Sequence, residues 1–333
     1  MNHEQTSRVT IGILVYNGQK YFDFLFPSLF DQDYSDVEIL VLDNNSPEKD
    51  AEILEKKWKN KLKIFRKEEN LGFAGGHNFL INKMNGEYYL CLNQDILLEK
   101  NYVSELVKIM ESDEKIASAT GKILKWDFSR GFEGKTKFID TTGISASKAQ
   151  HFFDRGQGEV DHGQFETIEE IFACSGAAPM YRKAAIEDVS CIGRRDGDVA
   201  LTFDETFFMY KEDIDLGYRL RFAGWKNVYA PNAIAYHDRT VSSSQKKSPK
   251  VREWSYQNHL LLLEKNFSSN FSWKTRICTY LRNSLLSLHF FFSFPRKYFS
   301  IRRKLRDNIA GMRGKNEIVK HRVSPGEIEK FFL

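Results

Sequence analysis

The feature that most constrains the fold of this chain is a series of short apolar runs, each followed by a polar cluster. Continuous apolar runs of this length, rich in β-branched residues, predict strands that are buried on both faces. These strands are expected at 9–16, 37–42, 62–66 and 88–92. The segments between them have helical composition at 21–30, 49–58, 77–84 and 101–111. Such alternation predicts an α/β domain with a mostly parallel sheet flanked by helices, whereas the glycine-rich segment 72–76 is expected to be a loop.

Two polar clusters stand where expected strands end. Asp43 opens the sequence DNNSP after the second strand, and Asp95 closes the sequence NQD after the fourth. Parallel sheets bind ligands at the carboxyl ends of their strands. A carboxylate fixed there can hold a hard divalent cation, which in turn stabilises a diphosphate as a leaving group. Either cluster taken alone is also explained as a turn or a helix cap.

A third acidic cluster opens a helix expected to end near Gly224. Glu212, Asp213 and Asp215 place three carboxylates within four residues. Such groups repel one another unless positive charge is near, and a helix N-terminus supplies some of it. One of them, held beside a bound substrate, can act as a general base; the alternative is an acidic first turn that only stabilises the helix. His237, after a short apolar strand, is a candidate metal ligand, although a lone histidine is more often structural.

In their order along the chain these motifs resemble those of the inverting glycosyltransferases of family 2, especially the branch that contains bacterial rhamnosyltransferases. The resemblance extends from Val9 to Arg239. It implies the GT-A fold, a Rossmann-like sheet flanked by helices, followed here by a C-terminal helical extension. The motifs are VYNG at 15–18, VLDNNS at 41–46, ENLGFAGGHN at 69–78, LNQD at 92–95 and FDETFFMYKEDIDL at 203–216, with the segment 224–237 completing them.

The resemblance also implies roles for single residues. Asp213 would deprotonate the acceptor hydroxyl, with Glu212 supporting it, and Asp95 and His237 would bind Mn²⁺ or Mg²⁺. Donor-binding residues would be Val15, Tyr16, Asn17, Asp43, Asn45, Asn70, Gly72, Phe73, Gly76, His77, Asn78, Asn93, Gln94 and Arg239. The acceptor side would be formed by Ser175, Gly176 and Trp225, although tight packing explains the small residues equally well and core packing is the more common role of such a tryptophan.

The implied reaction is a single displacement that inverts the anomeric carbon of a nucleoside-diphosphate sugar. The resemblance favours dTDP-rhamnose as donor, then a UDP-hexose, and a hydroxyl of a growing, lipid-linked surface polysaccharide as acceptor. One alternative is a nucleotidyltransferase. Those enzymes usually have a glycine-rich loop with a basic residue directly after the first strand, whereas the turn here, Asn17-Gly18-Gln19-Lys20, contains a single glycine. The other is a non-catalytic carbohydrate-binding or scaffold protein, against which the presence of Asp95 and Asp213 argues.

Charge divides the chain into two parts. The net charge is +4, yet residues 272–333 carry 14 Lys and Arg against 4 Asp and Glu, so the preceding residues are acidic. We therefore expect a glycosyltransferase domain over 1–245 and a basic, aromatic-rich extension over 246–333. Such an extension fits an anionic membrane surface or a homodimer contact, and nucleic acid is not expected as a partner. Arg282, Asn283 and His289 interrupt the apolar stretch 277–294, which predicts a helix on a membrane or against the body, not a span.

The four cysteines are widely spaced and form no C-x-x-C pair, so neither a zinc site nor a redox motif is expected. Reduced thiols are typical of the cytoplasm. The N-terminal residues are polar and lack the apolar stretch of a signal peptide. We therefore expect a cytoplasmic protein, held peripherally at the inner face of the membrane if the extension binds lipid.

Overall fold

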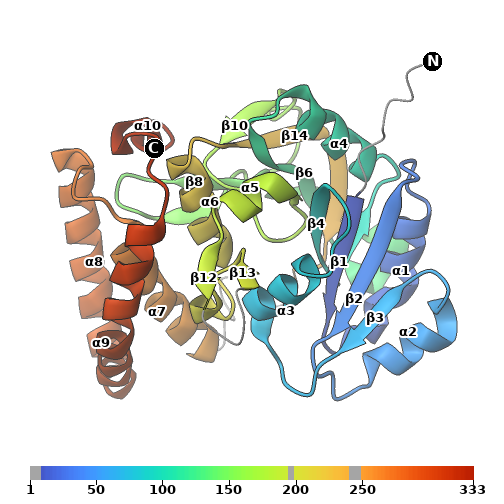
Figure 1. The fold of residues 1–333 in the computed structure, drawn as a ribbon, viewed down its shortest axis with the longest axis horizontal. Helices are drawn as coiled ribbons and strands as arrows, with labels where there is room; N and C mark the ends of the chain where they lie inside the picture. The colour runs from blue at the N-terminus through green and yellow to red at the C-terminus, as the bar shows by residue number, and fades with distance from the viewer. Residues whose placement is uncertain (1–8, 194–198, 240–248) are drawn as a thin grey trace.

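The computed structural model describes residues 9–193, 199–239 and 249–333 and is organised around one large mixed sheet (Figure 1). The expected boundary at 245/246, and most of the Ser/Lys-rich stretch 241–250 predicted to be mobile, lie outside the described residues. The strands of the large sheet are β1 (Val9–Val15), β2 (Val37–Asp43), β3 (Lys63–Arg66), β4 (Tyr88–Asn93), β5 (Ile96–Leu98), β6 (Ile116–Trp126), β7 (Lys135–Thr141), β10 (Glu169–Ile171), β11 (Met180–Arg182) and β14 (Lys226–His237).

The strand order is β10-β14-β6-β11-β4-β1-β2-β3, with β5 added beside β14 and β7 beside β6. β1 runs parallel to β2 and β4, and β14 runs parallel to β6. β11 is antiparallel to both β4 and β6, and therefore joins the two parallel halves. Two small hairpins complete the strands: β8 (Ile144–Ala146) with β9 (Phe152–Asp154), and β12 (Cys191–Gly193) with β13 (Val199–Leu201).

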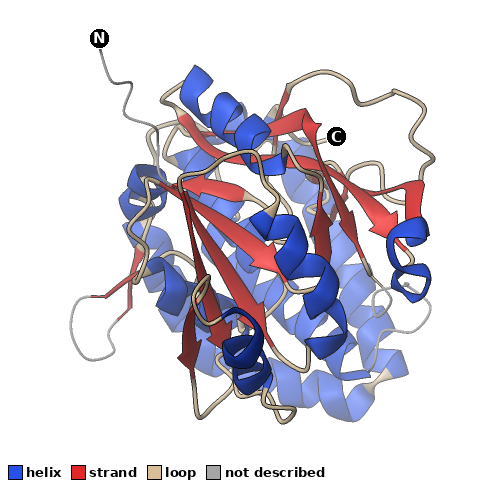
Figure 2. Ribbon diagram, turned by 90° about the vertical axis from the view of Figure 1, so that its right-hand side faces the viewer, coloured by secondary structure: helices blue, strands red, loops and turns tan. Residues whose placement is uncertain are grey.

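Helices cover both faces of the sheet (Figure 2). Alternate residues of the central strands enter two different cores: Leu90 packs with α1 and α4, whereas Cys91 packs with α3, α5 and α6. Burial on both faces explains why these strands are continuous apolar runs. The helices are α1 (Gln19–Phe30), α2 (Asp50–Trp58), α3 (Gly72–Ile81), α4 (Tyr102–Ser112), α5 (Lys183–Asp188) and α6 (Glu212–Phe222), with 3-10 turns η1 (Phe128–Gly134) and η2 (Glu205–Phe207).

The glycine-rich segment 72–76, expected to be a loop, instead forms the first turns of α3. The backbone N–H groups of Phe73 and Ala74 donate to the carbonyl of Phe208, which satisfies donors that a helix start leaves open. Gly72 has a φ of 69°, and a Cβ there would lie 2.5 Å from the Phe208 carbonyl oxygen. A tertiary partner therefore overrides the poor helix propensity of glycine.

The C-terminal extension is helical, as predicted: α7 (Pro249–Asn266), α8 (Trp273–Ser293), α9 (Pro295–Ile318) and α10 (Pro325–Glu329). These helices stand at one side of the sheet domain (Figure 1). Leu261 and Phe290 of the extension share a core with Phe172, Ile214 and Tyr218 of the sheet domain. No helix within the described ranges is both long and apolar enough to cross a membrane.

A buried ionic network also joins α7 to the sheet domain. The ammonium group of Lys265, on α7, donates to Asp204 and Asp215, at 2.9 Å from each. Asp215, near the start of α6, also accepts from Arg219 and Asn266. All three members of the central Lys265–Asp204–Asp215 group are essentially inaccessible to solvent. The third carboxylate of the acidic cluster is therefore an anchor for the extension.

Candidate active site

Predicted donor-side residues gather at the carboxyl ends of β1 and β2. Val15 lies opposite Asp43 in the parallel pair, so the turns that follow the two strands are neighbours. The Asp43 carboxylate accepts from the backbone N–H groups of Ser46 and Ala51, at 2.7 and 3.0 Å, and thereby shapes the turn before α2. Asn17 accepts from Ser46, which ties the first turn to the second. Tyr16, Asn17 and Asn45 are exposed beside this junction.

Gln94 fixes the turn that carries Tyr16. Its side-chain amide accepts from the Tyr16 N–H at 2.9 Å and donates to the Tyr16 carbonyl at 3.2 Å. A Cβ at Gly18 would lie 2.3 Å from the Gln94 amide oxygen, so a larger residue there would displace the Gln94 side chain from this approach. Gln94 thus holds the predicted nucleotide-side turn directly beside Asp95.

Asn44, which the sequence motifs contain but which was not predicted as a site residue, organises the next loop. Its side chain donates to Asn70 and to the Gly72 carbonyl, and accepts from the Leu71 N–H. Asn70 in turn accepts from the Gly72 N–H at 2.8 Å. Asn70 is exposed, so the loop before α3 opens onto the same edge of the sheet as Tyr16.

Three predicted donor residues of α3 point into the interior. His77 bonds to the Tyr89 hydroxyl at 2.8 Å and the Cys91 thiol at 3.3 Å, and burial lowers the pKa of His77 to about 3, which keeps the ring neutral. Asn78 bonds to both backbone groups of Phe203. A Cβ at Gly76 would lie 2.8 Å from Leu14, so the small residue allows α3 to pack on β1. These contacts are structural, and a direct donor role for the three residues stays a prediction.

The two predicted metal ligands are brought together. β5 and β14 are antiparallel with His237 opposite Ile96, which places Asp95 beside the imidazole. The Nε2 atom of His237 lies 3.3 Å from Asp95 Oδ1, and Nδ1 lies 2.8 Å from Asp140 Oδ2. Burial disfavours the charged ring, but Asp95 and Asp140 outweigh burial and raise the pKa of His237 to about 10.

Asp140 was missed by the sequence analysis. It lies on β7, for which the sequence analysis predicted no strand, and it is completely buried. No motif marks it, because its partner His237 is distant in sequence and becomes a neighbour only through the β6–β7 and β6–β14 pairings. A carboxylate on one imidazole nitrogen orients the other nitrogen toward a metal.

Arg239 lies beyond His237 and is held by two carboxylates. Its guanidinium lies 2.7 Å from Asp154 and 3.4 Å from Asp140. Burial disfavours its charge, but Asp154 and Asp140 raise the pKa of Arg239, so it is a fixed cation beside the Asp95–His237 pair. Its predicted contact with the donor phosphate is compatible with this position.

The donor set at Asp95 and His237 fits a divalent cation. One carboxylate oxygen and one imidazole nitrogen are suitable ligands for manganese-like ions, and binding requires the proton on Nε2 to leave. Over the described ranges, no cluster of three or more His, Cys, Asp or Glu side chains is positioned to hold a metal ion. A cation here would therefore complete its shell with water and with phosphate oxygens of a donor, as magnesium commonly does in nucleotide sites.

Asp213 and Glu212, at the start of α6, are placed differently. Asp213 is half-buried and accepts from the N–H groups of Gly176 and Ile214, at 3.2 and 2.8 Å. Burial raises the pKa of Asp213, which makes it a stronger base, although Lys211 and the two N–H groups partly oppose this. Glu212 is buried, and burial together with Asp213 raises its pKa well above the usual range.

The segment Ser175–Ala177 connects the base to the metal pair. Gly176 donates to Asp213, and the carbonyl of the next residue, Ala177, accepts from the Asn93 N–H at 2.9 Å, two residues before Asp95. A Cβ at Gly176 would lie 3.3 Å from Phe73 and 3.7 Å from the Asp213 carboxylate, so all three meet here. Ser175 is buried beside this contact.

Trp225 does not join this group. It precedes β14, whereas His237 ends that strand, and a strand of this length spans roughly 35 Å. Its indole N–H donates to Asp188, which also pairs with Arg322. The structure thus places Trp225 at the opposite end of β14 from His237, and its acceptor-side role stays a prediction.

Comparisons with known proteins agree with this architecture. The chain is 24% identical over 270 residues to a poly-beta-1,6-N-acetyl-D-glucosamine synthase of Staphylococcus epidermidis, covering 80% of this chain and 58% of that protein. It is 26% identical over 124 residues to an uncharacterized glycosyltransferase of Haemophilus influenzae, covering 37% of this chain and 38% of that protein. The chain thus spans about half the length of these curated relatives.

Solved structures show the same fold at low sequence identity. GalNAc-T7 with UDP, GalNAc and Mn²⁺ matches with a TM-score of 0.57 at 13% identity, covering 79% of this chain and 48% of that chain. S. aureus TarS 1-349 in complex with UDP-GlcNAc matches with a TM-score of 0.53 at 18% identity, covering 98% and 84%. The profile described as "Glycosyl transferase family 2" matches residues 10–190, more than half of the chain. The chain therefore belongs to glycosyl transferase family 2.

Proposed function

We propose that this glycosyltransferase is metal-dependent and inverts the anomeric carbon of a nucleoside-diphosphate sugar. The observation that carries the proposal is the short connection between two unlike sites, the Asp213 carboxylate and the Asp95–His237 pair, through residues 175–177. A base on one side and a cation-binding pair on the other are what a displacement at the anomeric carbon requires.

In the proposed reaction Asp213 accepts the proton of the acceptor hydroxyl as its oxygen attacks the anomeric carbon. The two backbone N–H groups that bind Asp213 keep its carboxylate in one orientation. Glu212 lies next to it in the chain, and burial and the Asp213 charge both raise the pKa of Glu212. The bond from the anomeric carbon to the nucleoside diphosphate breaks in the same step, so no covalent enzyme intermediate forms.

Asp95 and His237 would hold a Mn²⁺ or Mg²⁺ ion, with Asp140 orienting the imidazole. When bound, the ion supplies positive charge that stabilises the leaving diphosphate. Gln94 positions the turn at Tyr16 beside it, and Asn17, Asp43 and Asn45 form the edge on which the nucleoside would lie. Arg239 stands at the same site as a fixed cation.

For the donor, the motif resemblance favours dTDP-rhamnose. The likeness to the poly-beta-1,6-N-acetyl-D-glucosamine synthase, and to TarS, whose structure holds UDP-GlcNAc, supports a UDP-sugar as the next candidate. For the acceptor, we propose a hydroxyl on a growing surface polysaccharide. A carbohydrate-binding protein without turnover is the alternative that the experiments must exclude.

Calorimetric titration with dTDP, UDP and GDP tests the metal site. One nucleotide is expected to bind tightly only with Mn²⁺, and Asp95→Ala should remove that dependence. Asp140→Asn should lower metal affinity by about 10- to 100-fold, because the orienting partner of His237 is weakened. Asp31→Asn, at an exposed carboxylate, is the matched control. An unchanged response to Mn²⁺ in Asp95→Ala and His237→Ala would return both residues to structural roles.

A further inference from the structure

The outer face of α8 is apolar, and none of the residues that the structure describes covers it. Its large side chains recur every three or four residues, which places them on one face of the helix. Each of them is between 49% and 76% exposed: Trp273, Ile277, Tyr280, Leu281, Leu285, Leu288 and Phe292. We name this set the α8 stripe. Folded monomers rarely expose an apolar patch of this continuity, so such a patch marks an interaction site.

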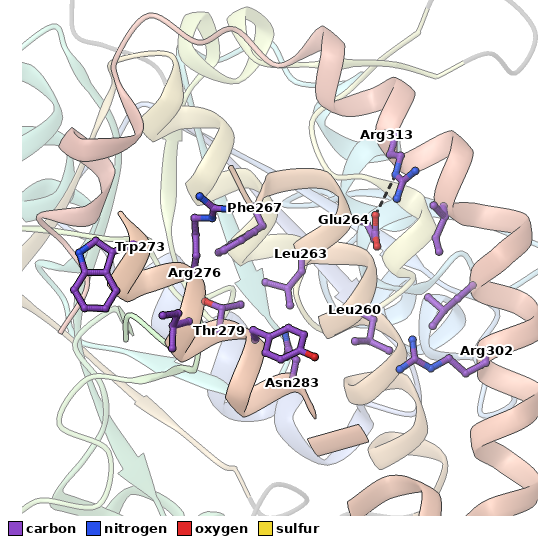
Figure 3. A pocket seen from close by; sticks show the side chains of 14 residues that line it. Leu260, Leu263, Glu264, Phe267, Trp273, Arg276, Thr279, Asn283, Arg302 and Arg313 are labelled. Carbon is purple, nitrogen blue, oxygen red and sulfur yellow. Dashed lines mark hydrogen bonds and ion pairs between the residues drawn. The ribbon is translucent and has the colours of Figure 1, made fainter. Parts of the chain in front are cut away.

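Part of the α8 stripe forms one wall of a groove of about 870 Å³ between α7, α8 and α9. Trp273, Ile277 and Tyr280 line it from α8, and its floor is apolar, with Leu260, Leu263, Phe267, Leu305 and Ile309. Arginines stand around this floor: Arg276 on α8, and Arg302 and Arg313 on α9 (Figure 3). Arg313 lies 3.3 Å from Glu264, and Arg302 donates to Tyr298 and Ser287.

The surroundings of the α8 stripe are strongly basic. Residues 273–318, which form α8 and α9, contain 11 Lys and Arg but only 2 Asp and Glu. Lys274, Arg276, Arg296 and Arg303 are all exposed. An apolar helix face bordered by basic residues, beside a groove with an apolar floor and an arginine rim, matches the two parts of a phospholipid: its acyl chains and its phosphate.

We propose that the α8 stripe is a docking surface for an anionic lipid bilayer, with α8 lying in the plane of the interface. A second copy of the chain is the less favoured occupant, because two like surfaces would bring two dense sets of positive charge together. An anionic membrane complements the same charge. The proposal does not depend on the identity of the donor, and it places the extension, rather than the sheet, against the lipid.

Co-sedimentation of the full chain with vesicles tests the proposal. At low salt the protein should bind vesicles of equal parts phosphatidylcholine and phosphatidylglycerol, and bind pure phosphatidylcholine vesicles far more weakly. The triple variant Leu281→Ser/Leu285→Ser/Phe292→Ser should lower the partition coefficient by at least about a hundredfold, because three large apolar side chains no longer enter the interface. Arg276→Glu should weaken binding to the anionic vesicles by about fivefold or more, and added salt should weaken it further.

The matched control replaces three exposed apolar residues elsewhere: Phe138→Ser/Val160→Ser/Ile168→Ser. It should bind anionic vesicles within about twofold of the unchanged protein, and circular dichroism should show that both variants are folded. Two results would overturn the proposal: a folded protein that stays in the supernatant, or equal loss of binding in both triple variants. A dimer seen by sedimentation velocity that the stripe variant abolishes, without vesicle binding, would assign the surface to a second copy instead.

Discussion

Asp213→Asn is expected to lower kcat by about 10³-fold, within the range of 10²- to 10⁴-fold typical of a lost general base, while nucleotide affinity stays unchanged. An amide cannot take the proton of the acceptor hydroxyl. Its oxygen can still accept from one of the N–H groups of Gly176 and Ile214, so the local backbone is retained. The affinity for nucleotide is preserved because its proposed contacts are with Tyr16, Asn17, Asp43 and Asn45, and not with Asp213.

Release of nucleoside diphosphate in the presence of acceptor measures this loss, and calorimetry measures the nucleotide affinity. In the unchanged protein kcat should fall as the pH drops below the raised pKa of Asp213, because the protonated carboxyl is no longer a base. The exposed Asp31→Asn should keep kcat within about twofold. A variant at Asp213 that transfers sugar normally but has lost nucleotide binding would remove Asp213 from the role of base.

Lys265→Met should destabilise the fold by about 3–5 kcal/mol, the loss typical of removing one partner of a buried ionic group. The ammonium group of Lys265 is inaccessible and lies 2.9 Å from both Asp204 and Asp215. Methionine fills the same space, but it leaves the two buried carboxylates without the positive charge of the Lys265 ammonium group. Because Lys265 lies on α7 and both carboxylates lie in the sheet domain, this loss measures how firmly the extension is joined to the domain.

Urea unfolding at neutral pH measures the difference in the free energy of unfolding between Lys265→Met and the unchanged protein. Lys274→Met, at an exposed lysine, is the control. Burial opposes ionisation of Asp204 and Asp215, but Lys265 and its neighbours lower the pKa of both. Their stabilisation is therefore fully present above the unfolded-state pKa, near 3.9, and is lost as the pH falls through the lower folded-state pKa. The difference in the free energy of unfolding between the unchanged protein and Lys265→Met should therefore become smaller in acid. A difference of less than about 1 kcal/mol in the free energy of unfolding at neutral pH would show that the ionic network contributes little to stability.

Most strands and helices of the first hundred residues follow directly from the sequence, although α3 begins at Gly72 instead of His77 and β5 was not predicted. A strand buried on both faces must be a continuous apolar run, and β1, β2 and β4 all satisfy this. Their polar ends, with Asp43 and Asp95, also lie where the pattern places them, because a parallel sheet brings strand ends to one edge. The helix that opens at Glu212 was predicted for a similar reason, since an acidic first turn matches the helix dipole.

What could not be predicted depends on contacts between distant segments. β6, which pairs with β7, β11 and β14, was not predicted because its sequence includes Lys122, a charge that is buried only because Asp161 and Glu166 pair with it. Only a short strand was predicted before His237, whereas β14 is longer: an irregularity in its pairing between Ala230 and Ile234 accommodates Pro231. No local sequence pattern indicates that Asp140 belongs to the site, because it contacts His237 only once the sheet has formed.

The central claim is turnover of a nucleotide sugar at the joined Asp213 and Asp95–His237 sites, and release of nucleoside diphosphate is its most direct test. The purified protein would be incubated with dTDP-rhamnose, UDP-hexoses, UDP-GlcNAc and GDP-mannose, with Mn²⁺ or with a chelator. We predict that one donor is hydrolysed slowly without acceptor and only with the metal. A folded protein that releases nucleoside diphosphate from none of these donors, and binds none of the free nucleotides, would contradict the account and favour a carbohydrate-binding role.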